Sequence, residues 1–256
     1  MMVRPYTLLA LVAVLAGIPF WARLARGDRR RFWVYLAALA GAFAGAKLVY
    51  LGAEGWLDWS RPERWLRLAT GKSILGGLLG GYVAVELTKR VIGYESITGD
   101  WFALITPIGI GLGRVGCWIH GCCAGRACSE AWFTLRDATG VPRWPSAPAE
   151  LTFNVLFLAA VLGMRWRKKL PGQHFHLYLI SYGLFRFLHE FLREEPRLLG
   201  PFTGYHFAAL LVLAFGVWRF AARRAVRAGA DALERGFEPL GKSRAPAAAI
   251  PATETH

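Results

Sequence analysis

Two arginines lie inside apolar segments of this chain that are long enough to cross a membrane. Arg114 lies in the glycine-rich run from Gly111 to Arg126, and Arg186 lies in a second, separate apolar segment. A guanidinium group at membrane depth is costly unless an anionic partner or a protected polar cavity receives it. Because two segments each offer an arginine, we expect a buried cavity in which donors converge on an anion such as a phosphate.

Glu190 follows Arg186 by four residues, so both side chains share one face of a helix. One interpretation is an ion pair that holds two helices together near the outer surface. The other, which we favour, is a charged wall on which Arg186 faces the anion and Glu190 orients it or moves a proton. Lys47 occupies a third apolar segment and either extends toward the membrane surface or contributes to the site.

The chain has 256 residues, of which 55% are hydrophobic, and the apolar residues come in blocks that match the thickness of a bilayer. We therefore expect an all-α integral membrane protein. The seven expected transmembrane helices are residues 6–21, 32–52, 73–92, 101–119, 149–164, 174–192 and 204–221. They form one domain, residues 1–221, followed by a basic, disordered cytoplasmic tail, residues 222–256.

Lys and Arg are concentrated in alternate loops and in the C-terminal tail, which predicts an N-terminus outside the cytoplasm and a C-terminus inside it. The formal net charge is +14. Most of this charge lies beside the expected spans, where anionic headgroups attract it, so we expect a membrane-lipid partner and no nucleic acid.

All four cysteines are close together in the sequence, between Cys117 and Cys128. One interpretation is a disulfide, or two, in an oxidising compartment, with a connectivity that spacing does not define. A second is a zinc site that includes His120, and a third is a reactive thiol. The cluster lacks the C-x-x-C pairs typical of zinc sites, so we expect no metal; no cofactor is expected either.

The motifs around both arginines resemble those of the prolipoprotein diacylglyceryl transferase family over residues 4–221. Gly113-Arg-Val-Gly116, followed by Gly121 and Gly125-Arg126, is similar to the family signature G-R-[IL]-G-N-F-x-N-G-E-x-x-G-R. Four further matches are Gly76-Gly-Leu-Leu-Gly80 for H-G-G-L-[IL]-G, Pro145-Ser146 with Glu150 for H-P-[ST]-Q-L-Y-E, Gly183 to Glu190 for G-x-x-R-F-x-x-E, and Arg4-Pro-Tyr6 for an early R-x-Y.

The resemblance implies a seven-span enzyme of the bacterial cytoplasmic (inner) membrane. Such an enzyme transfers diacylglyceryl from phosphatidylglycerol to the lipobox cysteine in the signal peptide of a prolipoprotein and releases glycerol 1-phosphate. It implies catalytic roles for Arg114, Arg186 and Glu190. The implied substrate-binding residues are Tyr6, Lys47, Gly76, Gly77, Cys117, His120, Gly125, Arg126 and Glu150.

The chain departs from the family where hydrogen-bonding and acid/base groups are expected. The replaced positions are Lys47 for arginine, Leu75 for histidine, Cys117 and His120 for asparagines, Cys122 for glutamate, Trp144 for histidine, and Ala147 and Ala149 for glutamine and tyrosine. His120 and His189 are the candidates for the base that the acceptor thiol needs.

These departures keep two other hypotheses open. One is a divergent paralogue that binds an anionic phospholipid and catalyses a different transfer or none. The other is a non-enzymatic membrane protein, such as an anion transporter. The transporter hypothesis is disfavoured because many transporters consist of two halves that repeat a broken-helix pattern, and the sequence of this chain has no such repeat.

Overall fold

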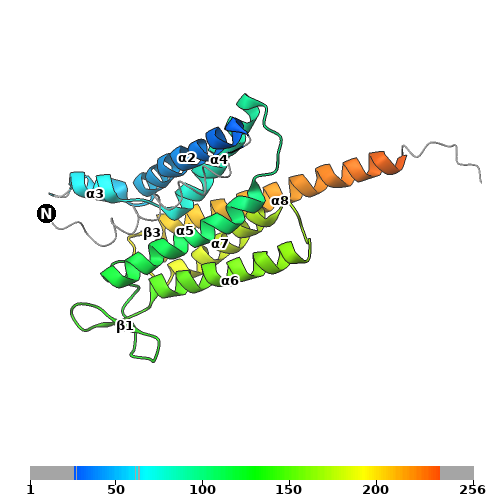
Figure 1. Ribbon diagram of the computed structural model, residues 1–256. Coiled ribbons are helices and arrows are strands. Elements are labelled where there is room, and N and C mark those ends of the chain that lie inside the picture. Colours follow the sequence, from blue (N-terminus) through cyan, green and yellow to red (C-terminus); the bar gives the residue numbers. More distant parts are fainter. Residues whose placement is uncertain (1–25, 27, 61, 63, 237–256) are drawn as a thin grey trace, which may run out of the picture. The chain divides into compact units, whose positions relative to one another are not determined.

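The computed structural model describes residues 26–236, apart from residues 27, 61 and 63. Its long helices are α2 (Arg29–Ala53), α4 (Ile74–Ile92), α5 (Gly99–His120), α6 (Ser146–Trp166), α7 (His174–Glu190) and α8 (Gly204–Gly236) (Figure 1). Each long helix overlaps one span expected from the sequence. The expected span at residues 6–21 lies outside the described residues, as does Tyr6.

Shorter elements occupy the connections between these helices. They are η1 (Gly55–Asp58), α3 (Arg64–Thr70), β1 (Leu135–Arg136), β2 (Pro142–Arg143), β3 (Arg197–Leu199) and β4 (Phe202–Thr203). The chain divides into two units, Met1–Phe220 and Ala221–His256. Helix α8 continues past residue 221, the expected end of the membrane domain, into the expected tail. The contacts described below belong to the first unit.

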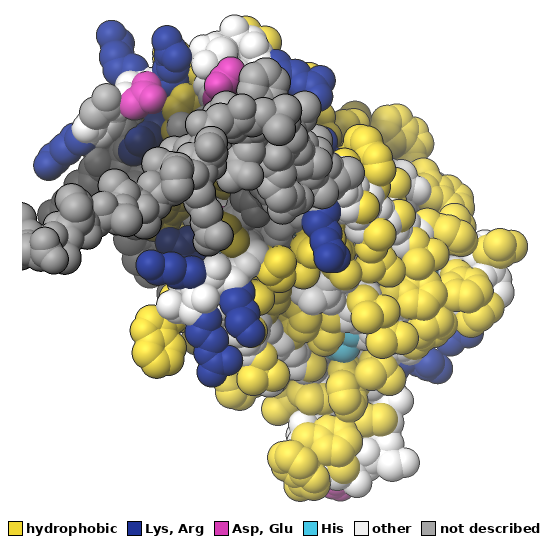
Figure 2. Space-filling view, turned by 90° about the vertical axis from the view of Figure 1, so that its right-hand side faces the viewer, with side chains coloured by type: hydrophobic (Ala, Val, Ile, Leu, Met, Phe, Trp, Pro, Cys, Tyr) yellow, Lys and Arg dark blue, Asp and Glu magenta, His cyan; other side chains and the backbone are white. Residues whose placement is uncertain are grey.

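The surface and length of the helices fit a membrane protein. Among the described residues, α2, α5, α6 and the Gly204–Arg224 part of α8 are long and apolar enough to cross a bilayer. Many large hydrophobic side chains are exposed, and Figure 2 shows them covering a broad face of the molecule. The all-α expectation is thereby confirmed in its coarse form, a mostly helical multi-pass membrane protein.

Glycines bring α2 and α4 into backbone contact. A Cβ atom added at Gly80 would lie 2.2 Å from the carbonyl oxygen of Gly41, and one added at Gly76 would lie 2.1 Å from that of Gly45. Small residues at such a spacing let two membrane helices approach closely and pack by van der Waals contact. The glycine motif of α4 therefore serves helix packing, whatever else it does.

Helices α5, α6 and α7 pack on one another, and α8 packs on α7. A Cβ at Gly183 of α7 would lie 2.8 Å from the backbone nitrogen of Leu213 in α8. Aromatic rings fill the space between α6 and α7, with Phe153 stacked on Phe185 at 4.5 Å between ring centroids. This close packing sets the rotation of α6 and α7 about their axes, and hence the direction of their polar side chains.

Two hairpins lie in connections for which the all-α expectation gave no regular structure. Strands β1 and β2 pair antiparallel, with Leu135 opposite Arg143, and β3 pairs antiparallel with β4. At the first hairpin, Asp137 accepts hydrogen bonds from Thr139 and from the Nε of Arg143, and these bonds hold its pKa below the usual value. Short polar side chains in turns of this kind replace the missing backbone partners.

Replacing Gly80 with alanine should separate α2 from α4. The added methyl group overlaps the backbone of Gly41, which cannot rotate away, and overpacking of this kind costs about 1–3 kcal/mol or more. We expect Gly80→Ala to lower the temperature at which the purified protein unfolds in detergent. Gly109→Ala in α5 is the matched control, because a Cβ there meets open space. Equal unfolding temperatures for the two variants would contradict this packing.

Candidate functional site

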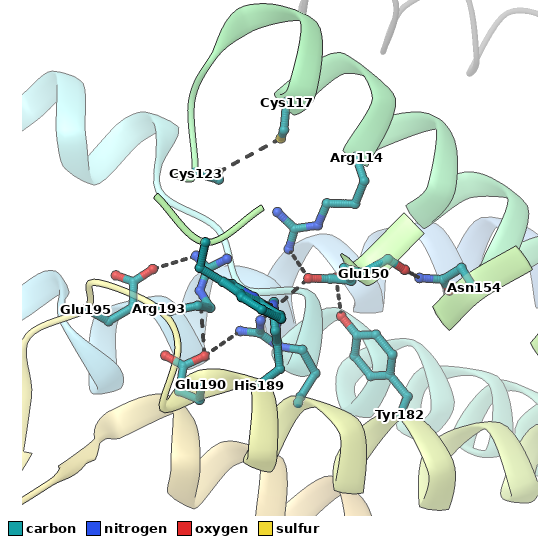
Figure 3. Close-up of polar contacts among 12 residues, drawn as sticks. Arg114, Cys117, Cys123, Glu150, Asn154, Tyr182, His189, Glu190, Arg193 and Glu195 are labelled. Atoms are coloured by element: carbon teal, nitrogen blue, oxygen red, sulfur yellow. Dashed lines mark hydrogen bonds and ion pairs between the residues drawn. The ribbon is translucent and has the colours of Figure 1, made fainter. Parts of the chain in front are cut away.

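A buried carboxylate lies where α5, α6 and α7 meet (Figure 3). Glu150, in the first turns of α6, is fully buried. Its Oε2 atom lies 2.8 Å from Nη2 of Arg114 in α5 and 3.5 Å from Nη1 of Arg186 in α7. The hydroxyl of Tyr182 donates to Oε1 at 2.7 Å. The two arginines of separate helices thus converge, as expected, and the group they share is Glu150.

A second carboxylate, Glu190, extends this network. Its Oε2 atom lies 2.8 Å from Nη2 of Arg186 and 3.7 Å from Nε of Arg193, and its Oε1 accepts from the hydroxyl of Thr203 at 3.2 Å. Arg186 and Glu190 both belong to α7, so the interpretation that their pair joins two helices is wrong. Glu150 makes that connection instead.

Arg193 also pairs with Glu195, whose Oε1 lies 2.5 Å from Nη2. The site is therefore a row of alternating charges that runs from Arg114 through Glu150, Arg186, Glu190 and Arg193 to Glu195. Figure 3 labels all of its members except Arg186. Such alternation keeps each buried charge beside an opposite one.

Several buried donors of this row have no hydrogen-bond partner among the described residues. They are Nε of Arg114, Nε of Arg186, and Nε and Nη1 of Arg193. Buried N–H groups are nearly always paired in native proteins, so these donors are available to an acceptor from outside the chain. An anion with several oxygens, such as a phosphate, supplies acceptors for guanidinium groups from more than one direction.

His189 lies beside this row, and its proton position follows from Trp144. The indole Nε1–H donates to Nε2 of His189 at 3.1 Å. In the neutral ring the proton then sits on Nδ1, which is buried and has no partner among the described residues. His189 is thus a donor in this geometry, and it can act as a base only if the bond to Trp144 breaks. The other candidate base, His120, is exposed at the end of α5.

Two further buried residues, Asn154 and Tyr178, form a hydrogen-bonded chain that ends on the backbone of Glu150. Asn154 Nδ2 donates to the carbonyl of Glu150 at 2.8 Å, and the hydroxyl of Tyr178 donates to Oδ1 of Asn154 at 2.8 Å. Sequence reasoning missed these residues and also Tyr182. Helical spacing could have identified two of them. Asn154 follows Glu150 by four residues, and Tyr182 precedes Arg186 by four, so each lies on the same helix face as a charged residue.

Gly125 and Arg126, both expected to bind substrate, hold the connection after α5 against the site. Gly125 donates its N–H to the carbonyl of Trp144 at 3.0 Å, and an added Cβ would lie 2.6 Å from that oxygen. Arg126 donates its backbone N–H to Leu192 and its Nη1–H to the carbonyl of Phe191, just after α7. These hydrogen bonds anchor the connection after α5 to the segment before α6 and to the end of α7.

Lys47, Gly76 and Gly77 lie away from the row of charges. The Nζ of Lys47 donates to the carbonyls of Leu68, Ala69 and Gly71, and so holds the end of α3 and the residue after it against α2. Gly76 packs on α2 as described, and a Cβ at Gly77 would lie 3.5 Å from the carbonyl oxygen of Ala42, an ordinary contact. The structure does not bring these three residues to Glu150.

The four cysteines are all free thiols. The sulfur atoms of Cys117, Cys122 and Cys123 lie within 4.8 Å of one another, and those of Cys117 and Cys123 are 3.9 Å apart. The hydrogen bond shared with Cys117 and the positive charges of Arg114 and Arg193 lower the pKa of the Cys123 thiol to about 5. Figure 3 shows Cys117 and Cys123 beside Arg114, at the edge of the row of charges.

The apolar helices and the buried row of charges define a multi-pass α-helical membrane protein whose polar centre contains unpaired guanidinium donors. The family model of prolipoprotein diacylglyceryl transferase matches residues 1–222. The chain belongs to this family, so the resemblance read from its motifs is confirmed.

Three relatives illustrate the similarity, and each is named phosphatidylglycerol–prolipoprotein diacylglyceryl transferase. The protein of Pseudoalteromonas atlantica is 33% identical over 78% of this chain and 75% of its own length. That of Rhodospirillum rubrum is 31% identical over 87% of this chain and 89% of its own length. That of Mannheimia succiniciproducens is 34% identical over 64% of this chain, and the alignment spans 63% of that relative.

Replacing Glu150 with glutamine should destabilise the protein. The change leaves the guanidinium groups of Arg114 and Arg186 without their shared charge, and breaking a buried ion pair typically costs about 3–5 kcal/mol. We expect a clear loss of thermal stability in detergent. The matched control is Glu130→Gln, which breaks an exposed pair with Arg136 and should change stability little. Similar stabilities for the two variants would mean that Glu150 does not hold the helices together.

Proposed function

We propose that this chain transfers diacylglyceryl from phosphatidylglycerol to the lipobox cysteine of a prolipoprotein and releases glycerol 1-phosphate. The observation that carries the proposal is the set of buried, unpaired guanidinium donors on Arg114, Arg186 and Arg193. Family membership and the names of the relatives support the identity of donor and acceptor.

The reaction exchanges a carbon–oxygen bond for a carbon–sulfur bond. The acceptor sulfur, as a thiolate, bonds to the glyceryl carbon that carries the phosphate, and the electron pair of the breaking C–O bond leaves on the phosphate oxygen. The phosphate thereby gains a negative charge. Donors that are already oriented toward this charge stabilise the transition state more than the ground state.

Arg114 and Arg186 are the proposed phosphate-binding and catalytic groups. Arg114 uses Nη2 on Glu150, whereas Arg186 uses Nη1 on Glu150 and Nη2 on Glu190. Each arginine keeps an unpaired, buried Nε–H. In this proposal Glu190 fixes the orientation of Arg186, and Glu150 fixes both guanidinium groups relative to one another. The planar, forked shape of the guanidinium group suits such two-sided use, because its donors point along more than one edge.

The remaining expected residues have supporting roles in this proposal. Gly125 and Arg126 hold the connection after α5 in place. Cys117 and His120 lie at the end of α5, where the acceptor is proposed to arrive. Gly76, Gly77 and Lys47 keep α2, α4 and the α3–α4 connection in place. Tyr6 is proposed to line the pocket, in the segment outside the described residues.

We further propose seven transmembrane helices in the bacterial cytoplasmic membrane, with the N-terminus outside and the C-terminus inside. The arrangement of charges supports this orientation. Arg219 of α8 pairs with Glu86 of α4 at 3.2 Å, and Asp100 at the start of α5 pairs with His174 at the start of α7 at 3.0 Å. These ends carry the basic loops, whereas Glu150 and Arg193 lie toward the opposite helix ends, where the signal peptide is proposed to bind.

Complementation tests the transfer reaction. The chain is expressed in a bacterium depleted of its own diacylglyceryl transferase, and the mobility of a reporter prolipoprotein is followed. We expect the wild type to rescue lipid modification. Arg114→Ala and Arg186→Ala should each reduce it by about 100-fold or more while the protein still inserts, because each removes a preoriented donor. Arg136→Ala, an exposed arginine of the β1–β2 hairpin, is the control. Failure of the wild type despite normal insertion would favour the divergent paralogue.

Reporter insertions test the proposed orientation. Alkaline phosphatase folds into its active form outside the cytoplasm, so an insertion after Gly140 should be active, whereas one after Lys169 or at the C-terminus should be inactive. A fluorescent protein at the same three positions should give the opposite pattern. Activity after both Gly140 and Lys169 would contradict a span through α6, and the reverse pattern would invert the topology.

A further inference from the structure

The three clustered cysteines come from two different parts of the backbone. Cys117 is buried in the last turn of α5, and Cys122 and Cys123 follow the end of the helix at Gly121. Gly121 and Cys123 both have left-handed backbone conformations, with φ of 68° and 60°, so the chain folds back over the last helical turn. This reversal brings three sulfur atoms together although the sequence has no C-x-x-C pair.

The spacing of the sulfur atoms fits a single soft metal ion. Zinc binds thiolate sulfur at about 2.3 Å in a tetrahedron, which places two such sulfurs about 3.8 Å apart. The sulfur atoms of Cys117 and Cys123 are 3.9 Å apart, and all three lie within 4.8 Å of one another. Only small side-chain movements are therefore needed for all three to reach one ion, and thiolate ligands select soft ions such as Zn²⁺.

The surroundings of the cluster match the charge of such a site. Three thiolates and one Zn²⁺ carry a net negative charge, and the positive charges of Arg114 and Arg193, both of which have unpaired donors, act on Cys123. The cluster is also open on one side, because Cys123 is exposed and Cys122 is half-buried. An ion with three protein ligands keeps a fourth position for an external ligand, as catalytic zinc sites do.

We propose that Cys117, Cys122 and Cys123 hold a zinc ion whose fourth position takes the thiol of the acceptor. This inference rests on the proposed function and deepens it, because the acceptor is itself a cysteine thiol. A thiol that coordinates zinc is held as a thiolate. The chain thereby gains a means of deprotonating the acceptor that needs no histidine at the position of Leu75 and no proton transfer to His189.

The proposed step balances in atoms and charge. The acceptor thiol binds zinc and releases its proton to water, and its sulfur then bonds to the glyceryl carbon beside the phosphate. The C–O bond breaks and its electron pair leaves with glycerol 1-phosphate, which Arg114 and Arg186 receive. The thioether is a weak zinc ligand, so the product leaves and the fourth position opens again. No oxidant or reductant is required.

Metal binding is tested on the purified full chain, kept reduced with a phosphine and first stripped of metal. Zinc is added in competition with a coloured chelator, and cobalt serves as a spectroscopic probe. We expect one zinc per chain and a cobalt spectrum with sulfur-to-metal charge transfer and tetrahedral ligand-field bands. Cys123→Ser and Cys122→Ser should weaken zinc binding by at least about tenfold, the scale found even for groups behind the ligands. Cys128→Ser is the matched control and should bind like the wild type.

A lipobox peptide tests the open position. Its cysteine form should shift the cobalt ligand-field bands, and the same peptide with serine should not. The inference is overturned if the reduced wild type binds no zinc, or if Cys122→Ser and Cys123→Ser bind it as tightly as Cys128→Ser. It is also overturned if metal-free Cys123→Ser transfers diacylglyceryl at the wild-type rate, a result that leaves the proposed function intact. Zinc binding and a thiol-dependent cobalt shift in a chain that fails complementation would contradict the proposed function alone.

Discussion

The burial of Glu150 is the constraint on which the rest of the site depends. A carboxylate removed from water costs several kcal/mol unless opposite charges and hydrogen-bond donors surround it. Here those groups come from two other helices, as Arg114 of α5 and Arg186 and Tyr182 of α7. The three helices therefore have to meet with one rotation and one register, and the same contacts that satisfy Glu150 also place two guanidinium groups side by side.

Much of the helical fold could be predicted from the sequence, because bilayer-length apolar blocks need no tertiary information to be recognised. The shared face of Arg186 and Glu190 follows in the same way from helical spacing. That both arginines meet on Glu150 could not be predicted, because contacts between helices depend on rotations that only packing sets. The glycines of α4 and the aromatic rings between α6 and α7 determine how these helices rotate against their neighbours. Their spacing in the sequence, however, does not identify the helix that each of them contacts.

The clustering of the cysteines could not be predicted from their spacing in the sequence. A pattern of metal-binding spacings presupposes a known turn, such as the one that a C-x-x-C pair makes. The turn after α5 is different, since Gly121 and Cys123 are both left-handed and reverse the chain within a few residues. For a non-glycine residue this conformation is uncommon, so residue types alone do not predict it. The proximity of Cys117 to Cys123 emerges only when the backbone path is known.

The positions at which this chain departs from the family signature differ in location from the positions that it retains. The charged residues of the row that match the family motifs are retained, namely Arg114, Glu150, Arg186 and Glu190, and removing one of them leaves a buried charge uncompensated. The positions that differ, including Leu75, Cys117 and Cys122, lie outside that row. Such positions can change without unpairing Glu150 or Glu190. The row of charges, in which a substitution leaves a buried charge unpaired, thus differs from the positions outside it, where the proposed zinc site would provide another way to deprotonate the proposed acceptor.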